Sequence, residues 1–427
     1  MPLGNALLPS AVFLKMFVVL RQRNFALLWF AGLISITGDW ALNVALPFFV
    51  YQMTGSALAT GLMFMARTLP GVLLGSVAGV FADRWDRKRT MVVVNLLATL
   101  LVLLMLTVKS IAGLWVVYLV AFVESAFMQF FAPAEKALLP RLVADEHLVT
   151  ANSLGALNAS LGMLIGPAIG GALMGMAGLT SVVIFDSASY LIAGVMIFLI
   201  AWSPDMTSKK PDTTDPFNTW SGIRRDWLDG LKLVKNSRPI TTIFVAVAIA
   251  MLGEGIIQAL LVLFVNLLKG GALEFGWLLT LRGLGGLLGG LIFGQIGAAV
   301  KPQRIFPWTL VGMGSLLLVM FNYPMLILAL ITLCLTGILA VGASVTSTTM
   351  LQNGVSNGYL GRIFGVFGMM AALMTLVGQG SAGALADRWG VGVLLNIGGG
   401  LYVLSGLIPL VMMKNLSRIG IEKTDII

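Results

Sequence analysis

The sequence contains little of what soluble enzymes and secreted domains use. Its 427 residues include one cysteine and one histidine, and only 11% of them are charged. A single cysteine excludes an internal disulfide or a thiolate cluster, and a single histidine excludes a multi-histidine metal site. The GxxxxGK[ST] pattern of ATP-binding loops is also missing. We therefore expect no enzyme, no metal and no cofactor, and any transport must use an ion gradient or diffusion.

Apolar residues and glycine are abundant instead. Hydrophobic residues make up 58% of the chain, which also has 50 glycines. A soluble chain of ordinary composition is about 25% charged. A bilayer core about 30 Å thick is crossed by about 20 apolar residues in a helix. We predict an all-α membrane protein with twelve spans, near 25–51, 58–81, 90–108, 112–133, 151–177, 180–202, 240–267, 274–299, 304–321, 325–350, 362–385 and 391–413.

The basic residues predict the orientation of these spans. Most of the 27 Lys and Arg residues fall in the N-terminal segment, loops 2–3, 4–5 and 8–9, the central loop and the tail, and the opposite side has only Lys109, Lys269 and Arg388. Such loops face the cytoplasm. We expect a multi-pass protein of the bacterial inner or plasma membrane with both termini cytoplasmic. Loop charge accounts for the net charge of +9, so we expect no nucleic acid partner.

The chain contains an internal repeat. A shift of 215 residues takes Gly38-Asp39 to Gly253-Glu254 and Arg67 to Arg282. Parallel repeats with a site between them are one transporter architecture. We predict two pseudo-symmetric six-helix halves, 1–202 and 240–427. The linker, 203–239, has an interfacial amphipathic pattern formed by Trp220, Ile223, Trp227, Leu231 and Val234.

Loop 2–3 has Asp83 before the basic run 87–89, the fifth span has Gly166-Pro167, and with the stretch 131–140 these segments resemble a known family, the major facilitator superfamily. Loop 2–3 resembles its first signature, with Gly79, Asp83, Arg84, Arg87, Lys88 and Arg89. The fifth span resembles the signature of its drug:proton antiporters, with Gly162, Gly166, Pro167, Gly170 and Gly171. The stretch 131–140 is similar to macrolide-efflux and enterobactin-exporter-like proteins. Two positions depart from the pattern: Asp86 replaces a usual Gly, and the fourth span has Glu124 where many drug exporters have an Arg.

Ionisable residues inside the spans are the candidates for coupling. An ionised side chain at the bilayer centre costs about 2.5–3.5 kcal/mol on insertion scales, so such residues face a partner or a cavity. Asp39, Glu124 and Glu254 are the predicted proton sites. Arg67 and Arg282 are the predicted partners of Asp39 and Glu254, since both pairs have the same spacing. The alternative is a static ion pair in each half. We expect Asp186, near the outer end of span 6, to make a structural hydrogen bond.

The resemblance implies a conformational gate in loop 2–3. Asp83 would dock at the start of span 11 near Arg362, because a carboxylate is stabilised at a helix N-terminus, and Arg87 would pair with Glu135. The alternative is that the basic residues only orient the protein. The glycines of the fifth span allow close helix packing, and a gating role is the alternative.

Together these features predict a secondary active transporter that works by alternating access. The expected function is proton-coupled efflux of amphipathic, lipophilic compounds, with multidrug or macrolide-like substrates. A transporter of a lysophospholipid-like lipid or another metabolite is the first alternative, and a non-transporting receptor is the second. The expected partners are a small lipophilic substrate, protons and membrane lipids, and we expect a monomer. Candidate cavity residues are Met63, Phe64, Met128, Phe131 and Met251.

Overall fold

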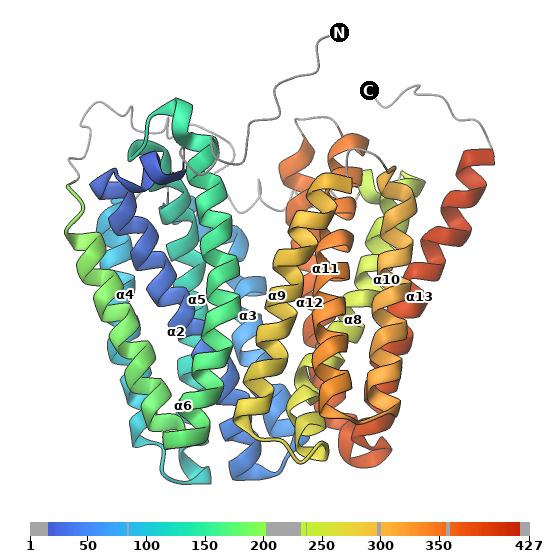
Figure 1. The fold of residues 1–427 in the computed structure, drawn as a ribbon, viewed down its shortest axis with the longest axis horizontal. Helices are drawn as coiled ribbons and strands as arrows, with labels where there is room; N and C mark the ends of the chain where they lie inside the picture. Colours follow the sequence, from blue (N-terminus) through green and yellow to red (C-terminus); the bar gives the residue numbers. More distant parts are fainter. Residues whose placement is uncertain are drawn as a thin grey trace.

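The computed structural model describes residues 16–82, 85–201, 232–235, 237–296, 300–355 and 359–418. Two bundles of helices stand side by side (Figure 1). The first half contains α2 (Arg23–Thr54), α3 (Ala57–Ala82), α4 (Arg87–Leu103), α5 (Leu114–Leu138) and α6 (Leu148–Phe198). The second contains α8 (Arg238–Leu267), α9 (Ala272–Ile296), α10 (Pro302–Asn322), α11 (Leu326–Gly354), α12 (Leu360–Trp389) and α13 (Val391–Arg418).

The helix α6 accounts for two of the twelve membrane crossings. Among the described residues, eleven helices are long and apolar enough to span a bilayer. With 51 residues, a straight α6 would measure about 77 Å, more than twice the thickness of a bilayer core. The helix breaks at Gly178, whose φ of 71° and ψ of −171° suit glycine. The limbs 148–177 and 179–198 form the fifth and sixth crossings, so the predicted twelve-span architecture is confirmed.

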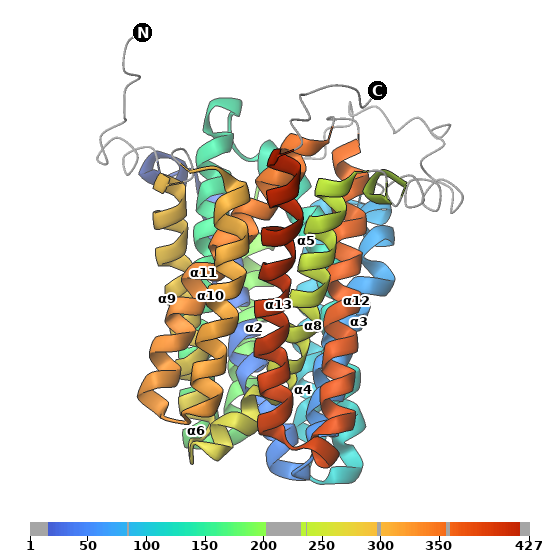
Figure 2. The same ribbon diagram turned by 90° about the vertical axis from the view of Figure 1, so that its right-hand side faces the viewer.

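The two halves repeat the same helix contacts. Gly38 on α2 lies against Ser189 on the second limb of α6, and its counterpart Gly253 on α8 lies against Gly398 on α13. In each half the first and sixth crossings therefore approach closely at the glycine that precedes the acidic residue. Figure 2 shows α13 next to α8 and α10, the two helices on which it packs most extensively.

The halves touch each other in the middle of the bundle and at one end of it. Gly171 on α6 faces Gly276 on α9, and Gly61 on α3 faces the carbonyl oxygen of Gln379 on α12. These contacts lie away from the basic end, which we define as the end where α2 and α8 begin. Toward the basic end, α6 and α9 diverge (Figure 1).

The glycines along α3 also differ between the two ends of the bundle: Gly61 contacts the other half, but Gly71 and Gly75 do not. A Cβ atom at Gly71 or Gly75, nearer the basic end, would meet only Gln129 of the same half. A Cβ atom at Gly365 or Gly368 on α12 would meet nothing within 4 Å. The described halves are thus packed together at the end opposite to the basic end and separate toward the basic end.

The predicted linker cannot be compared with the structure, because residues 202–231 lie outside the described residues. This range includes Trp220, Ile223, Trp227 and Leu231 of the predicted amphipathic helix. Val234 is in the described stretch 232–235, where it packs against the core of the second half. The domain boundaries at 202 and 240 remain predictions.

Two glycines of α6 provide a matched test of the packing. A Cβ atom at Gly170 would collide with the backbone of Ala41 on α2, whereas a Cβ atom at Gly155 would meet nothing within 4 Å. We expect Gly170→Ala to lower the free energy of unfolding by about 1–3 kcal/mol, because backbone atoms cannot move aside easily. Gly155→Ala should raise it by up to about 1 kcal/mol, as alanine favours the helix. Denaturation in detergent measures both, and equal stability of the two variants would contradict this packing.

Candidate functional site

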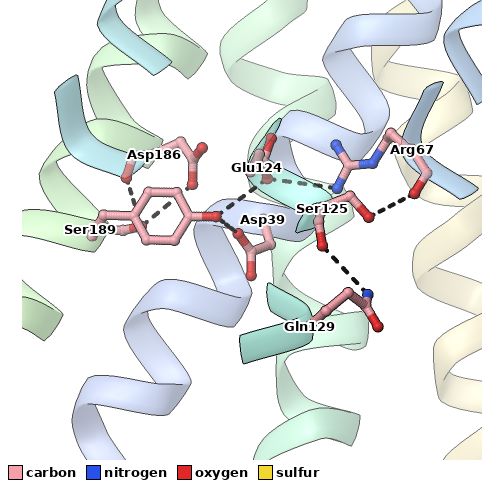
Figure 3. Close-up of polar contacts among 8 residues, drawn as sticks. Asp39, Arg67, Glu124, Ser125, Gln129, Asp186 and Ser189 are labelled. Carbon is pink, nitrogen blue, oxygen red and sulfur yellow. Dashed lines mark hydrogen bonds and ion pairs between the residues drawn. The ribbon is translucent and has the colours of Figure 1, made fainter. Parts of the chain in front are cut away.

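Five side chains from four helices meet inside the first half. This first-half cluster comprises Asp39 on α2, Arg67 on α3, Glu124 on α5, and Asp186 and Tyr190 on α6. The Tyr190 hydroxyl donates a hydrogen bond to Oδ1 of Asp39 and lies 3.2 Å from Oε1 of Glu124. Arg67 Nη2 lies 3.7 Å from the same Glu124 oxygen. Figure 3 shows Glu124 beside Arg67, with Asp186 farther away near Ser189.

Small residues allow these helices to approach each other. Gly38 leaves room for the Asp186 side chain next to Asp39. The glycines of the fifth-span motif that face α2 are Gly162, Gly166 and Gly170, which lie against Ile36, Trp40 and Ala41. Ser125 Oγ on α5 donates to the Arg67 carbonyl oxygen at 2.6 Å, which ties α5 to α3. The motif therefore packs the first limb of α6 against the helix that carries Asp39.

The polar groups of the first-half cluster are incompletely satisfied. Glu124 is 2% exposed and Asp186 is 0% exposed. Three buried polar atoms have no hydrogen-bond partner among the described residues: Glu124 Oε2, Asp186 Oδ2 and Arg67 Nη1. The cluster thus contains three carboxyl groups and one guanidinium, which forms its ion pair with Glu124. Burying charges without full compensation costs several kcal/mol per ion, so ionisation of all three carboxyl groups at once is unfavourable in this cluster.

The second half carries a different arrangement, the second-half cluster of Glu254, Gln258, Arg282 and Tyr402. Arg282 Nη2 donates to Glu254 Oε1 at 2.7 Å, and Gln258 Nε2 donates to the same oxygen at 3.1 Å. The Tyr402 hydroxyl donates to Glu254 Oε2 at 2.6 Å. One carboxylate is balanced by one guanidinium and both of its oxygens accept hydrogen bonds.

The structure therefore brings Glu254 and Arg282 together, but it corrects the predicted pair of Asp39 and Arg67. Arg67 forms its ion pair with Glu124, and Asp39 accepts a hydrogen bond from Tyr190. The reason is the additional acid on α5. The counterpart of α5 in the second half is α11, whose sequence contains no charged residue, so nothing on α11 competes with Glu254 for Arg282.

The gate motif is only partly described. Gly79 lies near the end of α3, and Asp83 and Arg84 lie outside the described residues. Arg87 Nη1 donates to the Ala137 carbonyl oxygen at 3.3 Å, close to Glu135 in sequence, and Lys88 Nζ donates to that of Ile200 at 2.7 Å. Asp86, the departure from the family pattern, is the N-cap of α4 and accepts from the Arg89 backbone N–H at 2.7 Å.

The candidate cavity residues have different environments. Met63 was predicted to line the cavity. The structure buries it fully in the core of the first half, where its side chain is part of the packing. Phe64 is half-buried against the cores of both halves. Met128 and Phe131 pack against cores of the first half, and Met251 packs against that of the second.

The sequence-based prediction missed the two tyrosines and the participation of Asp186 in the cluster. A signal for the tyrosines exists in the sixth crossing of each half. Tyr190-Leu-Ile-Ala-Gly194 matches Tyr402-Val-Leu-Ser-Gly406 with a shift of 212 residues, which takes Tyr190 to Tyr402. Gly194 lies against Asn95 on α4, and Gly406 lies against Pro307 on α10, so each motif packs the sixth crossing on the third.

Comparison with known proteins agrees with this architecture. The model of the Major Facilitator Superfamily matches residues 28–379. The chain belongs to this superfamily, whose members are membrane transporters and not enzymes.

Relatives and solved structures extend over nearly the whole chain. Macrolide efflux protein A of Streptococcus pyogenes is 23% identical over 385 residues, 89% of this chain and 93% of the relative. Enterobactin exporter EntS of Escherichia coli is 27% identical over 402 residues, 91% and 92% of the two chains. The crystal structure of the nucleoside transporter NupG superposes with a TM-score of 0.73 at 12% identity, covering 92% of this chain and 99% of NupG. This chain is thus a multi-pass transporter of small molecules with efflux proteins among its relatives.

The compensation within the second-half cluster can be tested by removing one partner and then both. We expect Glu254→Gln to lower the free energy of unfolding by about 3 kcal/mol, because Arg282 then stays buried without its carboxylate. Adding Arg282→Gln should restore part of this loss. Chemical denaturation in detergent measures all three proteins. A double variant no more stable than Glu254→Gln would show that the pair is not the source of the effect.

Proposed function

We propose that this transporter exports amphipathic, lipophilic compounds in exchange for protons. One observation carries the proposal: the first-half cluster contains three carboxyl groups and one guanidinium. If all three were ionised, two negative charges would remain uncompensated among helices that cross the bilayer. A cluster of this kind gains stability when it binds protons, and its charge then depends on the proton gradient.

Asp39 and Glu124 are the proposed proton-binding residues. Asp39 is only half-buried and supplies the more accessible side of the cluster, whereas Glu124 is enclosed. Arg67 is the partner of Glu124: an ionised Glu124 pairs with it, and a protonated Glu124 leaves it available. The second-half cluster has no excess of acid, so we assign Glu254 and Arg282 to a structural pair in this proposal.

The direction and the substrate class rest on the relatives. Two of them are named as an efflux protein and an exporter, and macrolides are large amphipathic molecules. The arrangement of the halves supports alternating access, because the contacts between them lie in the middle of the bundle and at the end opposite to the basic end. With the predicted orientation, the basic end faces the cytoplasm, from which an exporter takes its substrate. Loop 2–3, with Asp83, would act as the gate at that end.

The test is uphill transport of ethidium, a fluorescent lipophilic cation, in proteoliposomes with an imposed pH gradient. We expect wild-type protein to accumulate ethidium against its gradient, and a protonophore to abolish this accumulation. Glu124→Gln should reduce it to the level of empty liposomes, because the cluster loses a proton-binding group.

The matched control is Glu146→Gln, the same chemical change at a side chain that is 79% exposed, and it should transport as wild type. Uphill flux that survives the protonophore, or that Glu124→Gln leaves unchanged, would contradict proton coupling at this cluster. Folded protein that moves no ethidium but moves lysophospholipid would show that the substrate is a lipid.

A further inference from the structure

The Tyr190 hydroxyl stands between two carboxyl groups, which is the starting point for an inference that rests on the proposed function. The hydroxyl has one proton to donate and lies within hydrogen-bond distance of Asp39 Oδ1 and Glu124 Oε1. If that proton goes to Asp39, the Glu124 oxygen faces a lone pair of the phenol. This contact is attractive only when Glu124 itself carries a proton and donates it to the Tyr190 oxygen.

We propose that Tyr190 relays a proton between Glu124 and Asp39. In this step the Glu124 carboxyl O–H bond breaks and its proton bonds to the Tyr190 oxygen. The original hydroxyl proton of Tyr190 passes to Oδ1 of Asp39. Glu124 becomes a carboxylate, Asp39 becomes a carboxylic acid, and Tyr190 is a neutral phenol before and after the transfer.

Arg67 makes the two ends of this relay unequal. It lies 3.7 Å from Glu124 Oε1, and its Nη1 has no hydrogen-bond partner in the part of the chain that the structure describes. When Glu124 gives up its proton, the carboxylate and the guanidinium attract each other with full charges, so the transfer strengthens the link between α5 and α3. The proton arrives on Asp39, the more accessible of the two acids. The relay thus joins proton movement to helix contacts within the first half.

The surroundings of Tyr190 contain few other charged groups. Among the described residues, four titratable groups lie near its hydroxyl: Asp39 on α2, Arg67 on α3, Glu124 on α5 and Asp186 on α6 itself. The neighbouring helix α4 presents Asn95 and Thr99 to this limb of α6, and neither titrates. Asp186 interacts with Ser189 at 3.4 Å and not with the hydroxyl, so it is not part of the proton path.

The second half provides the comparison. Tyr402 lies at the matching place in the repeat, but within the described residues its hydroxyl contacts one carboxylate only, that of Glu254. It has no second acid to connect and therefore cannot act as a relay. Tyr190→Phe and Tyr402→Phe remove the same atom from two buried rings of the same kind, each 2% exposed or less.

Transport assays on these two variants form the first experiment. Wild type, Tyr190→Phe and Tyr402→Phe are reconstituted, and ethidium flux is measured with a pH gradient and as exchange at equal pH. We expect Tyr190→Phe to lower gradient-driven flux about a hundredfold, the range for a positioned proton-transfer group, and to change its pH profile. Exchange should persist in both variants, and Tyr402→Phe should keep the pH profile of wild type.

The outcomes separate the two proposals. Wild-type protein without gradient-driven flux would contradict the proposed function. A wild type that is driven by protons, together with a Tyr190→Phe variant of the same rate and pH profile, would overturn the relay and leave the proposed function intact. Loss of both flux and exchange in Tyr190→Phe would indicate structural damage and would also count against the relay.

A second measurement needs no substrate. Infrared difference spectra between acidic and alkaline pH report the carbonyl bands of protonated carboxyl groups in the purified protein, and Glu124→Gln identifies the band of Glu124. We expect Tyr190→Phe to shift this band, because the hydrogen bond to the phenol is lost, and Tyr402→Phe to leave it in place. An unshifted band in Tyr190→Phe would overturn the relay regardless of the transport result.

Discussion

The cost of an uncompensated charge in the bilayer is the constraint on which the rest of this structure depends. Each half places an acid on its first crossing and an arginine on its second, and each arginine must find a carboxylate. The second half meets this demand with one pair and two neutral donors around Glu254. The first-half cluster has three carboxyl groups and one arginine. The two halves share the same helix arrangement, but acidic and basic groups are equal in number in the second-half cluster and unequal in the first-half cluster.

Much of the fold could be predicted from the sequence because bilayer thickness and loop charge act on long segments. The break at Gly178 was predicted for the same reason, because a 51-residue apolar stretch is too long for one crossing. The pair of Glu254 and Arg282 followed from the repeat. The partner of Arg67 did not, because helix rotation decides whether an arginine on α3 meets α2 or α5, and spacing along the chain does not encode that rotation.

The tyrosines show a second limit of sequence reasoning. A buried tyrosine in an apolar span looks like any core aromatic until the groups around its hydroxyl are known. Tyr190 and Tyr402 match only with a shift of 212 residues, whereas the acids match with 215, so a single alignment frame hides them. Met63 shows the reverse error: its residue type suits a binding surface, but its position on α3 turns it into the core.

The sharp break at Gly178 joins two crossings with different tasks. The first limb of α6 carries Gly171, which touches α9 of the other half, and the second limb carries Asp186 and Tyr190. No loop separates them: Gly178 is the one residue with non-helical φ and ψ between Leu148 and Phe198. If the halves rock as proposed, movement at the α6–α9 contact would reach the carboxyl cluster through Gly178. The contact between the halves and the carboxyl cluster are thus joined along the chain by one glycine, Gly178.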